Sequence, residues 1–246
     1  MSGNNRTRKL YMDGAATMPT DPEVIESMLA CLNNKELFAN PSSVHVSGRD
    51  AMQKIEKARD QISKLINANK EDLIFTSGAT ESNNLAIIGS AKFRADHGKH
   101  LITMTTEHKA VSGPFDYLEE EGFEVTRLRP GTDGLLDIRQ LKKAIREDTQ
   151  LVSIMHMNNE IGAILNISEI ASICKDQDVL FHCDAAQSVG KISIDLIELP
   201  IDLMSISAHK FYGRQGIGAL FIREAHKVKL LPITHGGEQE LSLIHI

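Results

Sequence analysis

The sequence predicts an α/β fold in which a seven-stranded, mostly parallel sheet is sandwiched by helices. Short β-rich runs alternate with longer helical patterns from about residue 72 onward, as they do in parallel sheets covered on both faces. A chain of 246 residues can also bury a core of the size that such a sheet needs. No internal repeat or low-complexity linker marks a clear domain boundary.

The segment that precedes the sheet, within residues 20–70, predicts two helices. Their sequences are DPEVIESMLACLNN and SGRDAMQKIEKARDQISKLINA, and the loop KELFANPSSVHV separates them. A third helix is predicted within SNNLAIIGSAKFRADHG, where Leu85, Ile88 and Ala91 recur at helical spacing before Gly98 ends the pattern.

Runs of apolar and β-branched residues predict seven strands. They span residues 72–77, 100–105, 123–128, 151–156, 179–184, 203–208 and 218–223. Only about ten residues separate the sixth run from the seventh, which is too few for a helical crossover. The seventh strand is therefore expected to be antiparallel to the sixth.

Composition argues against several classes of protein. The 33 acidic and 27 basic residues are interspersed and give a net charge of −6, without the basic stripe of a nucleic-acid-binding protein. No apolar run is long enough to span a bilayer and the first residues lack a secretory signal, so a cytoplasmic protein is expected. Cys31, Cys174 and Cys183 lack CxxC spacing, and the histidines lack HExxH pairing. We expect reduced cysteines that serve packing, and no metal site.

Polar clusters follow five of the predicted strands. Because the carboxyl ends of parallel strands meet at one edge of an open sheet, these clusters are expected to form a ligand site. A lone histidine is usually structural and an Asp after a strand is often a helix cap, but five clusters at one edge are hard to explain by packing. They are TSGATESNN, TTEHKAV with His108, HMNNEIG with Asn158, Asn159 and Glu160, HCDAAQS with Asp184 and Gln187, and SISAHK with Ser207, His209 and Lys210.

Two of these clusters each allow two interpretations. The small residues of TSGATESNN open a helix, and its free backbone N–H groups could bind a phosphate, helped by Thr80; the loop could also be an ordinary cap completed by Glu81. Lys210 could be a solvated loop residue, or a buried amine whose pKa is lowered so that it forms a Schiff base.

Missing motifs narrow the choice. No GxGxxG follows a strand, and neither GxxxxGK[ST] nor GxSxG occurs, so a nicotinamide site, a P-loop and an α/β-hydrolase are disfavoured. A phosphate cradle, an aspartate, a histidine and a lysine remain. These are the groups that bind pyridoxal 5′-phosphate, which needs a Schiff-base lysine and an acidic partner for its ring nitrogen.

Eight stretches of the chain, in order and correctly spaced from about Leu10 to Glu240, closely resemble one family. They resemble the class V, fold-type I pyridoxal-phosphate enzymes, specifically the cysteine desulfurases of the iron–sulfur assembly type, which are transferases. The stretches are LYMDGAAT, FANPSSVH, FTSGATESNNLAI, TTEHKAV, SIMHMNNEIG, HCDAAQSVGK, DLMSISAHKFYG and HGGEQE. GRQG after Tyr212 departs from the pattern of many relatives.

The resemblance implies a role for each matching residue. Lys210 would be the Schiff-base lysine that also moves the substrate Cα proton, and Asp184 would hold the pyridine nitrogen protonated. His108 would stack on the ring and act in catalysis. The other implied cofactor contacts are Gln187 at the phenolic oxygen, Asn159 as a second polar contact, and Ala79, Thr80, Ser207 and His209 at the phosphate, while Asn40 would bind the substrate carboxylate.

The resemblance also implies a domain organisation and partners. Residues 1–240 would form the cofactor-binding large domain with its N-terminal helical segment, and residues 241–246 do not match the family. The family's small domain and its sulfur-accepting cysteine loop are expected to be missing, so this chain is expected to be an inactive fragment for sulfur transfer. The expected partners are L-cysteine, an iron–sulfur scaffold or other sulfur-acceptor protein, and a second subunit in a full-length homodimer. A cofactor-binding remnant without catalysis and a related enzyme such as a selenocysteine lyase are the alternatives.

Overall fold

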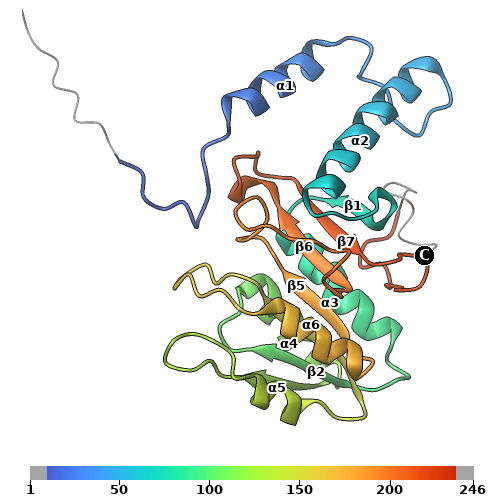
Figure 1. Cartoon of the computed structure of the whole chain (residues 1–246). Helices are drawn as coiled ribbons and strands as arrows, with labels where there is room; N and C mark the ends of the chain where they lie inside the picture. Colours follow the sequence, from blue (N-terminus) through green and yellow to red (C-terminus); the bar gives the residue numbers. More distant parts are fainter. Residues whose placement is uncertain (1–9, 237–246) are drawn as a thin grey trace, which may run out of the picture.

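The computed structural model describes residues 10–236, which form a seven-stranded sheet with helices on both faces (Figure 1). The strand order is β1-β7-β6-β5-β4-β2-β3. The antiparallel strand β7 pairs with β1 and β6, and the other pairs are parallel, which confirms the predicted sheet and hairpin. The strands are β1 (Leu73–Thr76), β2 (His100–Met104), β3 (Glu124–Leu128), β4 (Thr149–Met155), β5 (Leu180–Asp184), β6 (Leu203–Ser207) and β7 (Gly218–Ile222).

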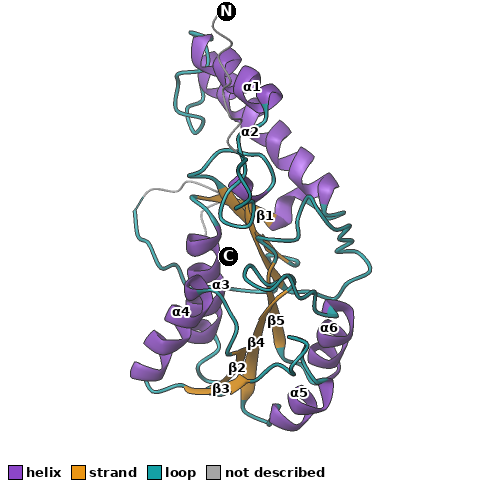
Figure 2. Ribbon diagram, turned by 90° about the vertical axis from the view of Figure 1, so that its left-hand side faces the viewer, coloured by secondary structure: helices purple, strands orange, loops and turns teal. Residues whose placement is uncertain are grey.

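Helices cover the two faces of the sheet in two groups, with α3 and α4 on one face and α5 and α6 on the other (Figure 2). Helices α1 and α2 precede the sheet, as predicted. The helices are α1 (Pro22–Asn33), α2 (Val46–Leu65), α3 (Ala79–Phe93), α4 (Lys109–Glu120), α5 (Ile138–Ala144) and α6 (Ile167–Asp176), with short 3-10 turns η1 (Lys70–Asp72) and η2 (Ala208–Lys210).

Each face of the sheet has its own apolar core. On one face, Leu141 of α5 and Ala171 of α6 pack with strand residues such as Phe181 in the largest cluster of buried residues. On the other, Ile87 of α3 and Phe115 of α4 pack in a second cluster. Both faces of the central strands are therefore buried, as expected for a parallel sheet.

Helix α3 differs in two respects from the sequence prediction. Ile87 is fully buried and Ile88 only half-buried, because Ile87 packs in the apolar cluster that α3 forms with α4 and the sheet. The helix ends at Phe93, well before Gly98. At Gly98 a Cβ would lie 2.2 Å from the carbonyl oxygen of Asp148, so this glycine permits a close backbone approach rather than ending the helix.

The cysteines lie in two kinds of environment. Cys174 and Cys183 are buried, which confirms their predicted packing role. Burial raises the pKa of Cys174 to about 12 and also raises the pKa of Cys183. Cys31 is exposed on α1, so the packing prediction is wrong for that residue.

Within residues 10–236, no helix is both long enough and apolar enough to cross a membrane.

Candidate active site

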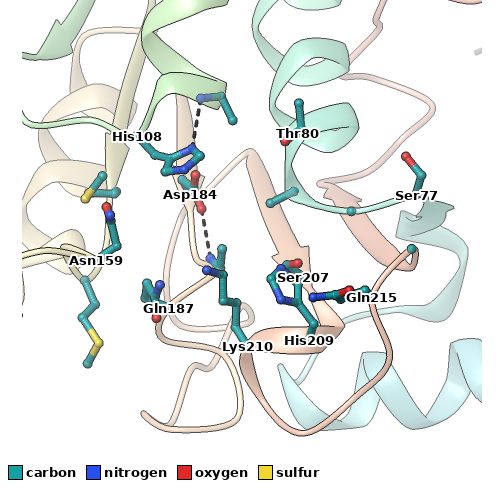
Figure 3. Close-up of a pocket in the computed structure, with 17 residues that line it drawn as sticks. Ser77, Thr80, His108, Asn159, Asp184, Gln187, Ser207, His209, Lys210 and Gln215 are labelled. Carbon is teal, nitrogen blue, oxygen red and sulfur yellow. Dashed lines mark hydrogen bonds between the residues drawn. The ribbon is translucent and has the colours of Figure 1, made fainter. Parts of the chain in front are cut away.

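The predicted cofactor-binding residues surround one cavity at the carboxyl ends of β4, β5 and β6, with a volume of about 400 Å³ (Figure 3). All nine predicted cofactor-binding residues line it, and they come from five separate segments of the chain. They are Ala79, Thr80, His108, Asn159, Asp184, Gln187, Ser207, His209 and Lys210. The polar clusters that are separate in the sequence therefore converge, as the strand-end argument predicts.

Asp184, the last residue of β5, lies at the base of this cavity and is buried. Its Oδ1 accepts a hydrogen bond from the Ala186 N–H (2.9 Å), and its Oδ2 accepts one from Nδ2 of Asn83 (2.7 Å). Burial raises the pKa of Asp184, while these two bonds and the charges of His108 and Lys210 oppose the rise. The carboxylate is thus held in a fixed orientation in an environment that favours a positively charged partner.

Lys210 lies in η2, directly after β6, and is half-buried rather than solvated. Its Nζ donates to the carbonyl oxygens of Ala15 (2.7 Å) and Ala16 (2.9 Å), so the N-terminal segment lies against it. Burial and the charge of Lys191 lower the pKa of Lys210, opposed by Asp184 and Asp13. A lowered pKa makes the neutral, nucleophilic amine more accessible, which favours the Schiff-base interpretation.

The start of α3 forms another wall of the cavity. Gly78 is the N-cap residue and supplies no side-chain cap, so the first backbone N–H groups of α3 are left for another acceptor. Gly78 adopts φ +149°, and a Cβ built there would meet no atom within 4 Å. Glu81 does make a local contact, since its carboxylate accepts from the Ser77 N–H (2.6 Å). Glu81 therefore binds the Ser77 N–H, while the first backbone N–H groups of α3 remain available to an anion.

His108, Gln187 and Asn159 face the same cavity from three loops (Figure 3). His108 caps α4, where its Nδ1 accepts from the Ala110 N–H (3.0 Å), so a neutral ring carries its proton on Nε2. Gln187 donates through Nε2 to the carbonyl of Ala15 (2.8 Å). The amide of Asn159 donates to Glu160 (2.8 Å).

Asn40 does not line this cavity. It lies exposed in the loop between α1 and α2, where its Oδ1 accepts from the N–H of Ser42 (2.9 Å). Its predicted contact with the substrate carboxylate stays a prediction.

The predicted tail at residues 241–246 lies outside the described residues.

Sequence reasoning missed several residues of the site. Gln215, within the unusual GRQG stretch, and the side chains of Met155 and Met157 line the cavity. Asn83 reaches Asp184 from α3. Glu107 accepts from the Met155 N–H (3.0 Å), and its pKa is raised well above its usual range by burial and by the charge of Asp184. In the sequence, Glu107 could have been identified as a residue near the site because it directly precedes His108.

Comparison with known proteins agrees with this geometry. The aminotransferase class V family matches residues 10–245. Proteins described as cysteine desulfurase IscS match 232 residues, with 50% identity in Photobacterium profundum and 52% in Mannheimia succiniciproducens. The match covers 94% of this chain but 57% of each relative, so the chain spans little more than half the length of these curated relatives.

Solved structures lead to the same family. A structure described as SspA in complex with cysteine has a TM-score of 0.91 at 43% identity and covers 96% of this chain and 67% of its own. The apo structure of a cysteine desulfurase from Thermococcus onnurineus has a TM-score of 0.85 at 31% identity, covering 93% of this chain and 57% of its own. The protein therefore belongs to the aminotransferase class V family, whose cofactor is pyridoxal 5′-phosphate, and is similar to its cysteine desulfurases.

Proposed function

We propose that this chain is the cofactor-binding part of a cysteine desulfurase, which converts L-cysteine to L-alanine and passes the sulfur on as an enzyme persulfide for iron–sulfur cluster assembly. The observation that carries the proposal is the convergence of Asp184, Lys210 and the uncapped start of α3 on one cavity. The similarity to cysteine desulfurases supports the choice of reaction within the family.

The cavity residues fit pyridoxal 5′-phosphate chemically. A buried carboxylate suits a protonated ring nitrogen, and a half-buried amine suits a carbonyl carbon. At the other wall, the backbone N–H groups that open α3, together with Thr80, Ser207 and His209, suit a phosphate. His108 would stack on the ring, while Gln187 and Asn159 would bind its polar edge.

When bound, the cofactor would supply an electron-withdrawing ring that acidifies the substrate Cα–H bond. Asp184 would keep the positive charge on the ring nitrogen by holding its carboxylate ionised. Lys210 would take up the Cα proton at Nζ and return it, a task that suits an amine with a lowered pKa. Asn40 would bind the substrate carboxylate.

Sulfur acceptance would fall to a residue other than the three cysteines of this sequence. A persulfide forms on a thiolate that reaches the substrate sulfur. Cys174 and Cys183 are buried and have raised pKa values, while Cys31 lies on α1 and not at the cavity. The chain alone would therefore bind the cofactor without transferring sulfur, and L-cysteine and a sulfur-acceptor protein such as an iron–sulfur scaffold would be partners of the full-length enzyme. We place that enzyme in the cytoplasm as a homodimer.

The first experiment measures cofactor binding and sulfur transfer separately. The purified chain is expected to bind pyridoxal 5′-phosphate with a visible absorption band and, after borohydride reduction, to carry a covalent adduct on Lys210 by mass spectrometry. Lys210→Ala should remove both signals. An unchanged band in Lys210→Ala would overturn the site assignment.

Addition of L-cysteine tests the reaction itself. The chain should yield neither alanine nor a protein persulfide in excess of the Lys210→Ala background, while a version extended to the length of the relatives should yield both. Selenocysteine turnover by the extended protein without cysteine turnover would instead favour the selenocysteine lyase alternative.

A further inference from the structure

Asn83 is a buried residue of α3 whose amide is only half satisfied. Its Nδ2 donates to Oδ2 of Asp184 (2.7 Å), and the residue has no measurable solvent exposure. Its Oδ1 is buried and has no hydrogen-bond partner among the described residues. A buried amide oxygen without a donor destabilises the fold, so overall stability does not explain this side chain.

The amide orientation depends on the charge of Asp184. An ionised carboxylate has only acceptor atoms, so it draws the NH₂ group of Asn83 toward it. A protonated carboxyl group would instead donate to the amide oxygen and favour the reversed orientation. In the observed orientation Nδ2 donates to Oδ2 of Asp184, and this bond stabilises the ionised carboxylate.

The position of Asn83 in α3 also links the two ends of the cavity. Ala79 and Thr80, at the start of this helix, line the wall proposed for the phosphate, and Asn83 lies one turn further along. The bond to Asp184 joins that helix to the end of β5. It therefore helps to set the spacing between the helix start and the carboxylate.

We propose that Asn83 is a positioning residue that keeps Asp184 ionised and oriented toward the ring nitrogen of the bound cofactor. The inference rests on the proposed function, because it assumes that pyridoxal 5′-phosphate occupies this cavity. The groups that face Asp184 are the Ala186 N–H, His108, Lys210 and the nearby carboxyl group of Glu107. Among the described side chains, Asn83 alone donates a hydrogen bond to the carboxylate.

The test uses the 246-residue chain loaded with pyridoxal 5′-phosphate that carries ¹⁵N in its ring. The ¹⁵N chemical shift reports whether the ring nitrogen is protonated, independently of turnover. Asn83→Leu removes the hydrogen bond at similar side-chain size. One hydrogen bond to a charged group corresponds to about one to two pH units, so the pH at which half of the ring nitrogen is protonated should fall by about that amount.

Asn84→Leu is the matched control. Asn84 is the next residue of α3. Its side chain donates to the carbonyl of Thr80 on its own helix and does not line the cavity. It should leave the ¹⁵N titration unchanged. If Asn83→Leu fails to fold, Asn83→Ser removes the same amide with a smaller side chain and should displace the titration in the same direction.

The outcomes separate the inference from the proposed function. A titration in Asn83→Leu or Asn83→Ser that matches the unmodified chain overturns the role of Asn83 and leaves the cofactor site intact. An equal displacement in Asn84→Leu also overturns it, because the cause is then a general change in α3. Failure of the unmodified chain to bind the cofactor overturns the proposed function together with the inference.

Discussion

The sheet and helix α1 bury their apolar residues to very different extents. All residues of β2, β4, β5, β6 and β7 are buried, whereas α1 has no buried residue. Helix α1 stands apart from the sheet (Figure 1). Leu29 and Leu32 of α1 are 52% and 77% exposed. Both regions contain apolar residues at regular spacing. Within the described residues, the apolar side chains of the sheet are buried and those of α1 are not. Apolar patterning thus predicts an element without predicting what covers it.

The cavity differs from both regions. Its walls are packed elements, but Asp184 in its lining and, near that carboxylate, Glu107 and the amide oxygen of Asn83 are buried groups that destabilise the fold. Functional sites commonly contain such groups, because a ligand supplies the missing partners. Substitutions in the packed core, in α1 and at the cavity should therefore change the free energy of unfolding by different amounts.

The largest effect is expected from a paired substitution in the two apolar regions. Phe115→Ala removes a fully buried ring of α4 and should lower the free energy of unfolding by about 3–5 kcal/mol. Leu29→Ala on α1 should change it by less than about 0.5 kcal/mol. Urea unfolding measures both. A loss for Leu29→Ala close to that for Phe115→Ala would show that another surface buries α1 in solution.

A smaller effect is expected from His182, a buried histidine of β5. His182 bonds Ser153 (2.7 Å) and Ser205 (3.0 Å), and burial lowers its pKa to about 3. In the unfolded chain this histidine takes up a proton near pH 6.5, whereas in the folded chain it stays neutral down to about pH 3. The contribution of neutral His182 to the free energy of unfolding is therefore fully present above pH 6.5 and is lost as the pH falls from 6.5 towards 3.

His182→Gln keeps a donor and an acceptor but does not titrate. Urea unfolding between pH 6.5 and 4 should therefore show a shallower loss of stability for this variant than for the unmodified chain, whatever its stability at neutral pH. Equal slopes in the two proteins would contradict the buried neutral histidine.

Asp184→Asn should stabilise the cofactor-free chain moderately. Because folding raises the pKa of this carboxyl group, the folded state binds its proton more tightly, and ionisation at neutral pH opposes folding. The variant should melt at a higher temperature than the unmodified chain at pH 7, and the difference should narrow as the pH falls through the folded pKa. Asp176→Asn, at an exposed position, is the control and should show no such trend. A lower melting temperature for Asp184→Asn would show that its hydrogen bonds outweigh the cost of burial.

The smallest effect concerns the cysteines and leaves stability unchanged. Cys31 is exposed on α1, whereas Cys174 and Cys183 are buried with raised pKa values. A thiol reagent should therefore label Cys31 in the folded chain and the other two only after unfolding. Slow labelling of Cys31, with rapid labelling in denaturant, would indicate that α1 is covered.

The extent of prediction differs between the sheet and the site. Strand positions, the antiparallel seventh strand and the convergence of the polar strand-end clusters follow from local patterns, because strand-end residues of a parallel sheet share one edge. The buried face of α3 does not, since Ile87 is buried against residues of α4 and the sheet that are remote from it in sequence. Asn83 and Glu107 were not predicted as site residues for a related reason. Each acts through a hydrogen bond to a residue from another part of the chain, Asn83 with Asp184 and Glu107 with Met155.

By itself, the sequence determined the α/β class, the family resemblance and the convergence of Asp184 and Lys210, because periodicity and motif spacing are properties of the chain. Only the tertiary structure decided which groups are buried, that Asn83 orients Asp184, that the N-terminal segment contacts Lys210, and that Asn40 and α1 lie apart from the cavity. Burial and hydrogen bonding join residues far apart in sequence, and the pKa values of a site depend on those contacts rather than on local sequence.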